Sequence, residues 1–404
     1  MVEFATRGVC AAHTIEEAQR IFWGALPQPR LAHETVALAD ALGRVLAQDQ
    51  RAEGDVPSFR RSSMDGFAVP AAAGPRLRVT GEIRMGHPAP APVAAGESFA
   101  IPTGGMLPAG ADAVVPIEHV RRDGDFIEIT RPAGPGENVV DPGEDVRAGE
   151  VVVPAGQRLR PQDLAALASV GVARVPVLAR PRVAILSTGD ELVPLGATPA
   201  PGQVRESNAV GLAACVARDG GSPAPGGIVP DDADAVRHRL RSALDEGDLL
   251  LVSGGSSVGE RDFVPSTLAA MGKPGMLVHG VALKPGKPTG LFVLDGKVAV
   301  ALPGHPVSAL VVYDVFVRPA LLRLGGDAAW RMPRGFAEAA LTEAVAAPRD
   351  RDFYCRVRLE GGRAVPLAAG SSLLSSLVHG TGLLRVPQGT RHNMGERVRV
   401  ELLA

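Results

Sequence analysis

Apolar residues recur at helical spacing near the start of the chain. Thr14 is followed three residues later by Glu17, the pattern of a capping box, which predicts a helix running to about Trp23. A second helical pattern covers residues 34–49. Its apolar positions are Val36, Leu38, Leu42, Val45 and Leu46. This part of the chain is therefore predicted to be helical.

The pattern changes between residues 51 and 146, where short alternating runs lie between Gly, Pro and Asp turns. Residues 76–81 and 113–118 are predicted strands. A helix is expected again over residues 161–171. This order predicts a β-rich module inserted into a helical region.

Strands and helices alternate from residue 181 to residue 325. The predicted buried strands are 183–186, 228–229, 249–252 and 298–301. Ser207 is the expected N-cap of the first helix in this region, and Pro306 opens the last one. The order predicts an α/β multidomain protein whose central domain is a doubly wound parallel sheet. Residues 330–404 alternate like the strands of a small β-barrel or sandwich.

Four polar or glycine-rich turns follow these predicted strands. They are STGDEL (187–192), VPDD (229–232), SGGSSVGERD (253–262) and LPGHPVS (302–308). Ligands of doubly wound sheets bind outside the carboxyl ends of the strands. The four turns are therefore expected to converge on one binding site.

The SGGSSVG turn has the residue types of an anion cradle. Gly254 and Gly255 let backbone N–H groups approach an oxyanion, and Ser256 and Ser257 add hydroxyl donors. A purely structural glycine turn fits the same residues equally well. Lys284 and Lys287 beside the turn in LKPGKPTG are either phosphate contacts or ordinary solvated lysines.

An acidic set accompanies this turn. Its members are Asp190, Glu191, Asp231, Asp232 and Asp262. Carboxylates facing a phosphate pocket would repel the ligand unless a divalent cation lies between them. The alternative for Asp231 and Asp232 is capping of the following helix. In the N-terminal half, Asp65 in SSMDGFAV and Thr103 on a Gly-flanked loop are further candidates, although Asp-Gly alone predicts only a turn.

Composition narrows the class of protein. The length of 404 residues suggests about two to four domains. The net charge of −2 argues against a nucleic-acid binder. Three widely spaced cysteines show no metal or disulfide pattern, so a reducing cytoplasm is expected. The most apolar stretch, 298–322, is interrupted by Pro, Gly, His and Asp, so no membrane span is predicted.

Together the motifs resemble the MoeA-type molybdenum insertases, a family that is similar to the E domain of gephyrin. The motifs that carry the resemblance are ALGRVLAQD, SSMDGFAV, IPTGGMLPAGADAVVPIE, GEDV, STGDEL, SGGSSVGERDF, LKPGKP, LPGHPVSAL and GSSLLSSLVHGTGLL. Their order covers nearly the whole chain. The sheet segment alone would also resemble molybdopterin adenylyltransferases.

The resemblance implies four parts and a homodimer. The parts are a helical stalk (14–46 and 147–180), the inserted β-rich module (47–146), the doubly wound domain (181–327) and a C-terminal β-barrel (328–404). The active site would lie between the sheet domain of one subunit and the β-rich module of the other.

The resemblance also implies roles for single residues. Asp65, Thr103, Asp145, Glu191, Asp231 and Asp262 would be catalytic, with Glu191, Asp231 and Asp262 as metal ligands. The substrate-binding residues would be Gly254, Gly255, Ser257, Lys284, Lys287, Ser308 and Ser371. Two positions depart from the family pattern: Arg60 replaces an acidic residue, and His305 replaces the asparagine of a PGNP turn.

The implied reaction joins molybdate to adenylylated molybdopterin and releases AMP and molybdenum cofactor. Mg²⁺ is the expected divalent cation, because molybdate and pyrophosphate repel each other. Other proteins of cofactor biosynthesis are expected partners; nucleic acid and membrane are not. The alternatives are nucleotidyl transfer onto molybdopterin and a non-catalytic scaffold like gephyrin.

Overall fold

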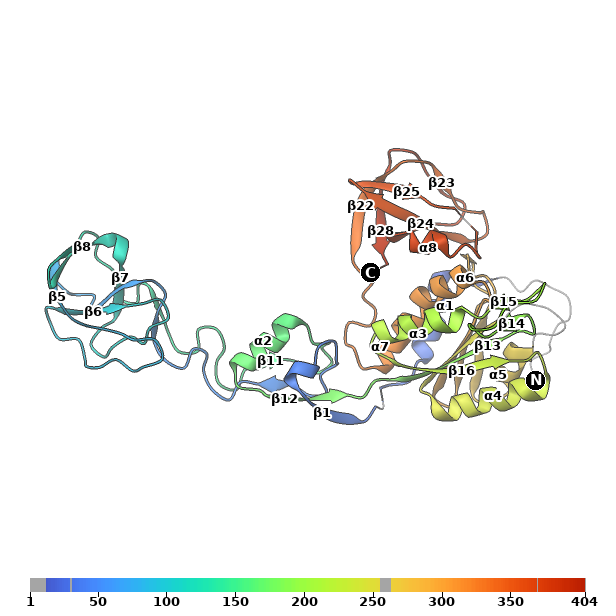
Figure 1. The fold of residues 1–404 in the computed structure, drawn as a ribbon, viewed down its shortest axis with the longest axis horizontal. Helices are drawn as coiled ribbons and strands as arrows, with labels where there is room; N and C mark the ends of the chain where they lie inside the picture. Colours follow the sequence, from blue (N-terminus) through green and yellow to red (C-terminus); the bar gives the residue numbers. More distant parts are fainter. Residues whose placement is uncertain (1–11, 30, 255–262, 369, 404) are drawn as a thin grey trace.

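The computed structural model describes residues 12–29, 31–254, 263–368 and 370–403. The molecule is elongated (Figure 1). A β-rich module lies at one end, a sheet domain with an attached barrel lies at the other, and a narrow middle segment joins them. No helix among the described residues is long and apolar enough to cross a membrane.

The sheet domain is built on six strands in the order β16-β13-β17-β21-β20-β18. Their bounds are β13 Arg182–Thr188, β16 Ser222–Val229, β17 Leu249–Ser253, β18 Pro274–His279, β20 Gly290–Leu294 and β21 Lys297–Leu302. The first four strands in that order are mutually parallel, which confirms the predicted doubly wound sheet. β20 runs antiparallel to β21 through a turn at Asp295 and Gly296, both with positive φ. This Asp-Gly hairpin signal was not used in the sequence prediction.

Helices cover both faces of this sheet. One face carries α1 Ile15–Ala25, α3 Asn208–Arg218, and the continuous α6 Pro306–Val312, η3 Tyr313–Val317 and α7 Arg318–Leu324. The other carries α4 Ala233–Glu246 and α5 Phe263–Ala269. Val183 and Ile185 of β13 face the first group, and Ala184 and Leu186 face the second. The strands are therefore buried on both sides, as their continuous apolar runs predict.

The capping box predicted for α1 is confirmed. Thr14 Oγ1 accepts from the Glu17 N–H at 3.2 Å, and the Glu17 carboxylate accepts from the Thr14 N–H at 3.0 Å. The buried face of α1, which includes Phe22, packs in the apolar core of the sheet domain. The family resemblance implied that this segment belongs to the stalk. Its buried residues pack instead in the core of the sheet domain, so α1 is part of that domain.

The prediction of a helix over residues 34–49 is wrong. The segment forms β1 His33–Ala37, which pairs antiparallel with β12 Arg174–Leu178, followed by the short 3₁₀ helix η1 Leu38–Asp40. Gly43 then turns the chain with φ of 72°. Apolar residues at near-helical spacing are buried here by pairing with a distant strand, so tertiary contacts override the local periodicity.

The rest of the middle segment completes a small core. Its elements are β2 Gln50–Arg51, β11 Val151–Val153 and α2 Pro161–Ser169. The helix predicted over 161–171 is thus confirmed as α2, and Gly171 follows it with φ of 84°.

The β-rich module contains a six-stranded sheet in the order β7-β4-β6-β5-β9-β8. The bounds are β4 Gly66–Val69, β5 Arg76–Glu82, β6 Glu97–Ile101, β7 Ala113–Pro116, β8 Val120–Asp123 and β9 Phe126–Ile129, with η2 Ile117–His119 between β7 and β8. A separate pair, β3 Arg61–Ser62 and β10 Val139–Val140, lies in the same module. The two predicted strands at 76–81 and 113–118 correspond to β5 and β7.

The C-terminal region is a closed barrel, as predicted. The ring runs β24-β25-β22-β28-β26 and closes through β24 and β26. Its elements are β22 Phe336–Leu341, β24 Asp352–Glu360, β25 Arg363–Pro366, α8 Ser375–Val378, β26 Gly382–Val386 and β28 Arg397–Leu402. The short pair β23 Val345–Ala346 and β27 Arg391–His392 is separate from the ring. β19 Leu283–Lys284, which follows β18 of the sheet domain, adds to this barrel by pairing with β24.

Candidate active site

The carboxyl ends of four parallel strands lie side by side. Thr188 at the end of β13 is in register with Val229 of β16, and Ser253 of β17 is in register with Leu302 of β21. Ser187 and Ser253 join the two pairs. The turns that follow these residues are the four motifs singled out in the sequence. The geometry therefore brings the first residues of these four turns to one edge of the sheet.

Gly254 begins the glycine-rich turn and has no room for a side chain. Its φ is 91°, and a Cβ there would overlap the carbonyl oxygen of Thr188. Its N–H donates to the carbonyl of Leu302 at 3.2 Å. Backbone therefore meets backbone at this point, which only glycine permits. Gly255, Ser257 and Asp262 lie outside the described residues.

Two of the acidic residues next to this turn accept hydrogen bonds from backbone N–H groups. Asp190 accepts a hydrogen bond from the backbone N–H of Asp231 at 3.1 Å. Asp232 caps α4 by accepting from the Ala235 N–H at 2.8 Å, which confirms the capping interpretation for this residue. Glu191 is exposed, and its carboxylate lies over Gly189. Within the described ranges no three His, Cys, Asp or Glu side chains form a group able to hold a metal ion.

Asn208 is a site residue that the sequence analysis missed. Its Nδ2 donates to Ser253 Oγ at 2.5 Å and to the carbonyl of Gly304 at 2.8 Å, so it ties the SGGSS turn to the PGHP turn. Asn208 Oδ1 and Thr188 Oγ1 are both buried, and neither has a hydrogen-bond partner among the described residues. Unsatisfied buried polar atoms at a strand end are typical of a place where a ligand or water completes the contacts.

The predicted N-cap of α3 is also corrected. Ser207 makes no side-chain cap bond. The buried Glu206 accepts from the Ala209 N–H at 2.8 Å and from Ser187 Oγ at 3.0 Å. The sequence did contain a signal for this cap. A carboxylate three residues before a first-turn N–H can accept from it, and its negative charge is favourable at the positive end of the helix.

Lys284 and Lys287 lie where the sheet domain meets the barrel. Both side chains are exposed. Lys284 Nζ is 5.0 Å from the centre of the Phe353 ring on β24. The hydrogen bond from Arg351 and, less strongly, the charge of Lys287 lower the pKa of Asp350. The two lysines therefore give this junction a positive rim.

Ser371 contacts the start of α6, the helix that carries Ser308. Ser308 is buried in the first turn of the helix. The backbone N–H of Val307 donates to the carbonyl of Ser371 at 3.1 Å, and Ser371 Oγ lies 3.2 Å from His305 Nδ1. His305, the departure from the family turn, thus contacts a barrel residue.

Asp65 and Thr103 form a pair in the β-rich module. Asp65 Oδ1 accepts from the Thr103 N–H at 2.7 Å and from Thr103 Oγ1 at 3.0 Å, and these bonds lower the pKa of Asp65. The exposed Asp145 lies near the base of the module, where its N–H donates to the carbonyl of Val56. Within one chain the module lies far from the strand ends of the sheet domain (Figure 1). Arg60 pairs with Asp141 at 2.8 Å.

Three family models together match most of the chain. The MoeA N-terminal region (domain I and II) matches residues 13–171, a probable molybdopterin binding domain matches 184–323, and the MoeA C-terminal region (domain IV) matches 338–403. Molybdopterin molybdenumtransferase 2 of Mycobacterium tuberculosis is 35% identical over 370 residues, which cover 88% of this chain and 91% of that one. The chain belongs to the MoeA family. A molybdopterin molybdenumtransferase of Haemophilus influenzae is 32% identical over 402 residues, covering 96% and 98% of the two chains.

The fold agrees with that of a MoeA protein. A crystal structure of the molybdopterin biosynthesis MoeA protein from Pyrococcus horikoshii OT3 matches with a TM-score of 0.85 and 32% identity. The match covers 97% of this chain and all of the other.

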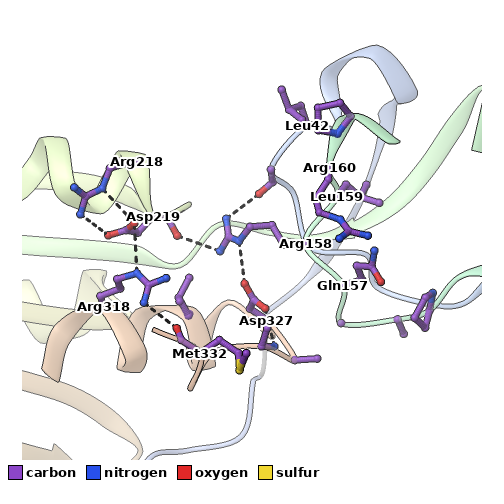
Figure 2. Close-up of a pocket in the computed structure, with 18 of the residues that line it drawn as sticks. Leu42, Gln157, Arg158, Leu159, Arg160, Arg218, Asp219, Arg318, Asp327 and Met332 are labelled. Carbon is purple, nitrogen blue, oxygen red and sulfur yellow. Dashed lines mark hydrogen bonds and ion pairs between the residues drawn. The ribbon is translucent and has the colours of Figure 1, made fainter. Parts of the chain in front are cut away.

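The large cavity of this MoeA chain lies away from the strand ends. Its volume is about 690 Å³, and it lies between the middle segment and residues of α3, α7 and the segment after α7 (Figure 2). Figure 2 shows Arg158 bound to Asp327 at 2.9 Å and Arg318 facing Asp219. None of the predicted site residues lines this cavity. We therefore place the candidate active site at the carboxyl edge of the sheet.

Proposed function

We propose that this MoeA chain is a molybdopterin molybdenumtransferase that inserts molybdate into adenylylated molybdopterin and releases AMP. The observation that carries the proposal is the similarity to relatives bearing that name, at 32–35% identity over 88–96% of this chain. The glycine turn, the exposed lysines and the two unsatisfied polar atoms at one sheet edge fit a site for an anionic substrate.

The proposed roles follow the position of each residue. Lys284 and Lys287 neutralise the phosphates of the pterin from the rim. The remaining substrate contacts come from Gly254, Gly255, Ser257, Ser308 and Ser371. The backbone N–H of Val307, the residue before Ser308, donates to the carbonyl of Ser371 at 3.1 Å. The proposed ligand of Ser257 and Ser308 is molybdate, and Ser371 is proposed to contact the same anion beside Ser308.

We propose Mg²⁺ as the divalent cation, with Glu191, Asp231 and Asp262 as its ligands. Glu191 and Asp231 follow the neighbouring strands β13 and β16, whose ends are in register. Oxygen ligands from carboxylates suit Mg²⁺. When bound, the cation would neutralise the charge that develops as the pyrophosphate bond breaks.

We further propose that the protein works as a homodimer with shared sites. Asp65, Thr103 and Asp145 would serve the sheet edge of the partner subunit. Their distance from the strand ends of their own chain supports this arrangement (Figure 1). The four-part division into stalk, module, sheet domain and barrel is part of the same proposal, with α1 assigned to the sheet domain. The cysteine pattern supports a cytoplasmic location.

The test is a reconstituted reaction. The purified protein, adenylylated molybdopterin, molybdate and Mg²⁺ are mixed, and AMP release is measured with and without molybdate. We expect molybdate-dependent AMP. If the protein instead adenylylates molybdopterin with ATP, it is an adenylyltransferase. If it catalyses neither reaction, the scaffold role remains.

A further inference from the structure

The largest fully buried side chain of the described residues is an arginine. Arg356 lies on β24 of the barrel with 0% of its surface exposed. None of the ion pairs found in the described part of the chain includes it. Burial lowers the pKa of its guanidinium, which nevertheless stays charged because its ordinary value is so high. Burying a cation without an acidic partner costs free energy, so the contacts that Arg356 makes are expected to serve a structural or functional purpose.

Those contacts all go to the segment that carries Ser371. The Arg356 Nη2 donates to the carbonyls of Ala368 at 2.6 Å and Gly370 at 3.1 Å. Its Nε donates to Ser376 Oγ at 3.1 Å. The guanidinium thus binds on both sides of Ser371. A planar fork of donors is needed to reach these acceptors together.

The same segment makes a contact with the sheet domain. The carbonyl of Ser371 accepts from the N–H of Val307, the second residue of α6. The first N–H groups of a helix have no acceptor within the helix. Ser371 therefore supplies the acceptor that Val307 lacks, and it does so beside Ser308.

We propose that Arg356 is a positioning residue that holds the Ser371 segment of the barrel against the start of α6. It fixes the segment from behind, through two backbone carbonyls and one hydroxyl. The effect of this contact on catalysis rests on the proposed function, whereas the contact itself does not. Lysine cannot replace the arginine here, because one ammonium group cannot reproduce the fork.

Hydrogen exchange of the full-length protein tests the contact without any substrate. In Arg356→Lys and Arg356→Met we expect the Val307 N–H to exchange at least about tenfold faster, since its acceptor becomes mobile. The N–H groups of β26 should keep their protection. Ser376→Ala, which removes one acceptor, should give a smaller increase, and Ser375→Ala, its exposed neighbour, should give none.

Two results would overturn the proposal. One is unchanged exchange at Val307 in both arginine variants and in Ser376→Ala. The other is equal loss of protection at Val307 and throughout β24 and β26, because Arg356 would then only stabilise the barrel.

A kinetic arm separates this inference from the proposed function. For Arg356→Lys we expect the KM for molybdate to rise about tenfold with a smaller change in kcat. Combining it with Ser371→Ala should add little beyond the larger single effect, because both act on one contact. Faster exchange at Val307 with unchanged molybdate KM would support Arg356 as the positioning residue and count against Ser371 as a molybdate contact.

Discussion

Tyr354 and Leu383 of the barrel are buried in the same apolar cluster as β13, β17 and β21 of the sheet domain. The two apolar clusters of the β-rich module, in contrast, contain only residues of the module. The barrel is also held by Arg385, which pairs with Glu16 of α1 and with Asp352. The barrel can therefore present Ser371 to the sheet edge within one chain. The module shares no apolar cluster with the sheet domain of its own chain among the described residues. This separation fits the proposal that Asp65 serves the sheet edge of a partner subunit.

The largest expected effect tests this difference directly. Asp65→Asn and Glu191→Gln should each lose about a hundredfold or more in molybdate-dependent turnover. If sites are shared, mixing the two variants with subunit exchange gives heterodimers with one intact site. About half of a random mixture is heterodimer, so activity should recover to about a quarter of wild type. AMP release and native mass spectrometry measure the two quantities.

A matched mixture controls for this result. Asp65→Asn mixed with Thr103→Ala places both changes in the module, so every shared site carries one of them. No recovery is expected there. Lack of recovery in the Asp65 and Glu191 mixture, with exchange demonstrated, would mean that the module serves its own chain.

The second prediction concerns the sheet domain. Gly254→Ala forces a left-handed residue and an overlap with the Thr188 carbonyl, and should cost about 3 kcal/mol of unfolding free energy. Gly227→Ala, at φ of 83° with open space around it, should cost only about 1 kcal/mol. Trp23 and Trp330 both pack in the sheet-domain core, so their fluorescence during denaturation reports this region. Equal costs would contradict the close approach at Gly254.

The third prediction separates the regions by pH. Burial raises the pKa of Asp314 at the sheet–barrel junction from 3.8 to about 6, against the lowering effect of Arg334 and Arg218. A raised carboxyl pKa contributes stability that is present below 3.8 and is lost as pH rises through 6. Acidification from pH 7 to 4 should therefore stabilise the sheet domain in tryptophan-monitored unfolding. Asp314→Asn should remove this dependence; an unchanged slope would show that another group causes it.

In the middle segment the sign is opposite. A hydrogen bond from Arg160 lowers the pKa of Asp163, at the start of α2, from 3.8 to about 2. Its contribution is present above 3.8 and is lost as pH falls to 2. The protection factors of the α2 N–H groups, which are corrected for the intrinsic pH dependence of exchange, should fall over that interval in the wild type and not in Asp163→Asn.

The smallest expected effects are at the sheet–barrel rim. Lys284→Ala and Lys287→Ala should each weaken binding of adenylylated molybdopterin about tenfold at low salt, and less at high salt, because the contacts are charge pairs near solvent. Lys273→Ala, another exposed lysine of the same domain, is the control. Calorimetry measures the affinities. Equal affinities for all three variants would assign the lysines to the ordinary solvated surface.

Much of the fold followed from local signals. The capping box at Thr14, the buried strands and Pro306 at the first position of α6 are written in neighbouring residues, and the structure has all of them. The helix expected over residues 34–49 failed because β1 is stabilised by β12, more than 130 residues later in the chain. Asn208 was missed because its role also depends on residues far away in the sequence: it donates hydrogen bonds to both Ser253 and Gly304.

The sequence by itself determined the family, the parallel sheet and the turns that end its strands, because each depends on residue types at short spacing. Only the tertiary structure decided which groups meet. It placed α1 in the sheet core, set Glu206 in place of Ser207 at α3, and brought Arg356 behind Ser371. Such contacts depend on burial and direction across long chain separations, which no local pattern of residues records.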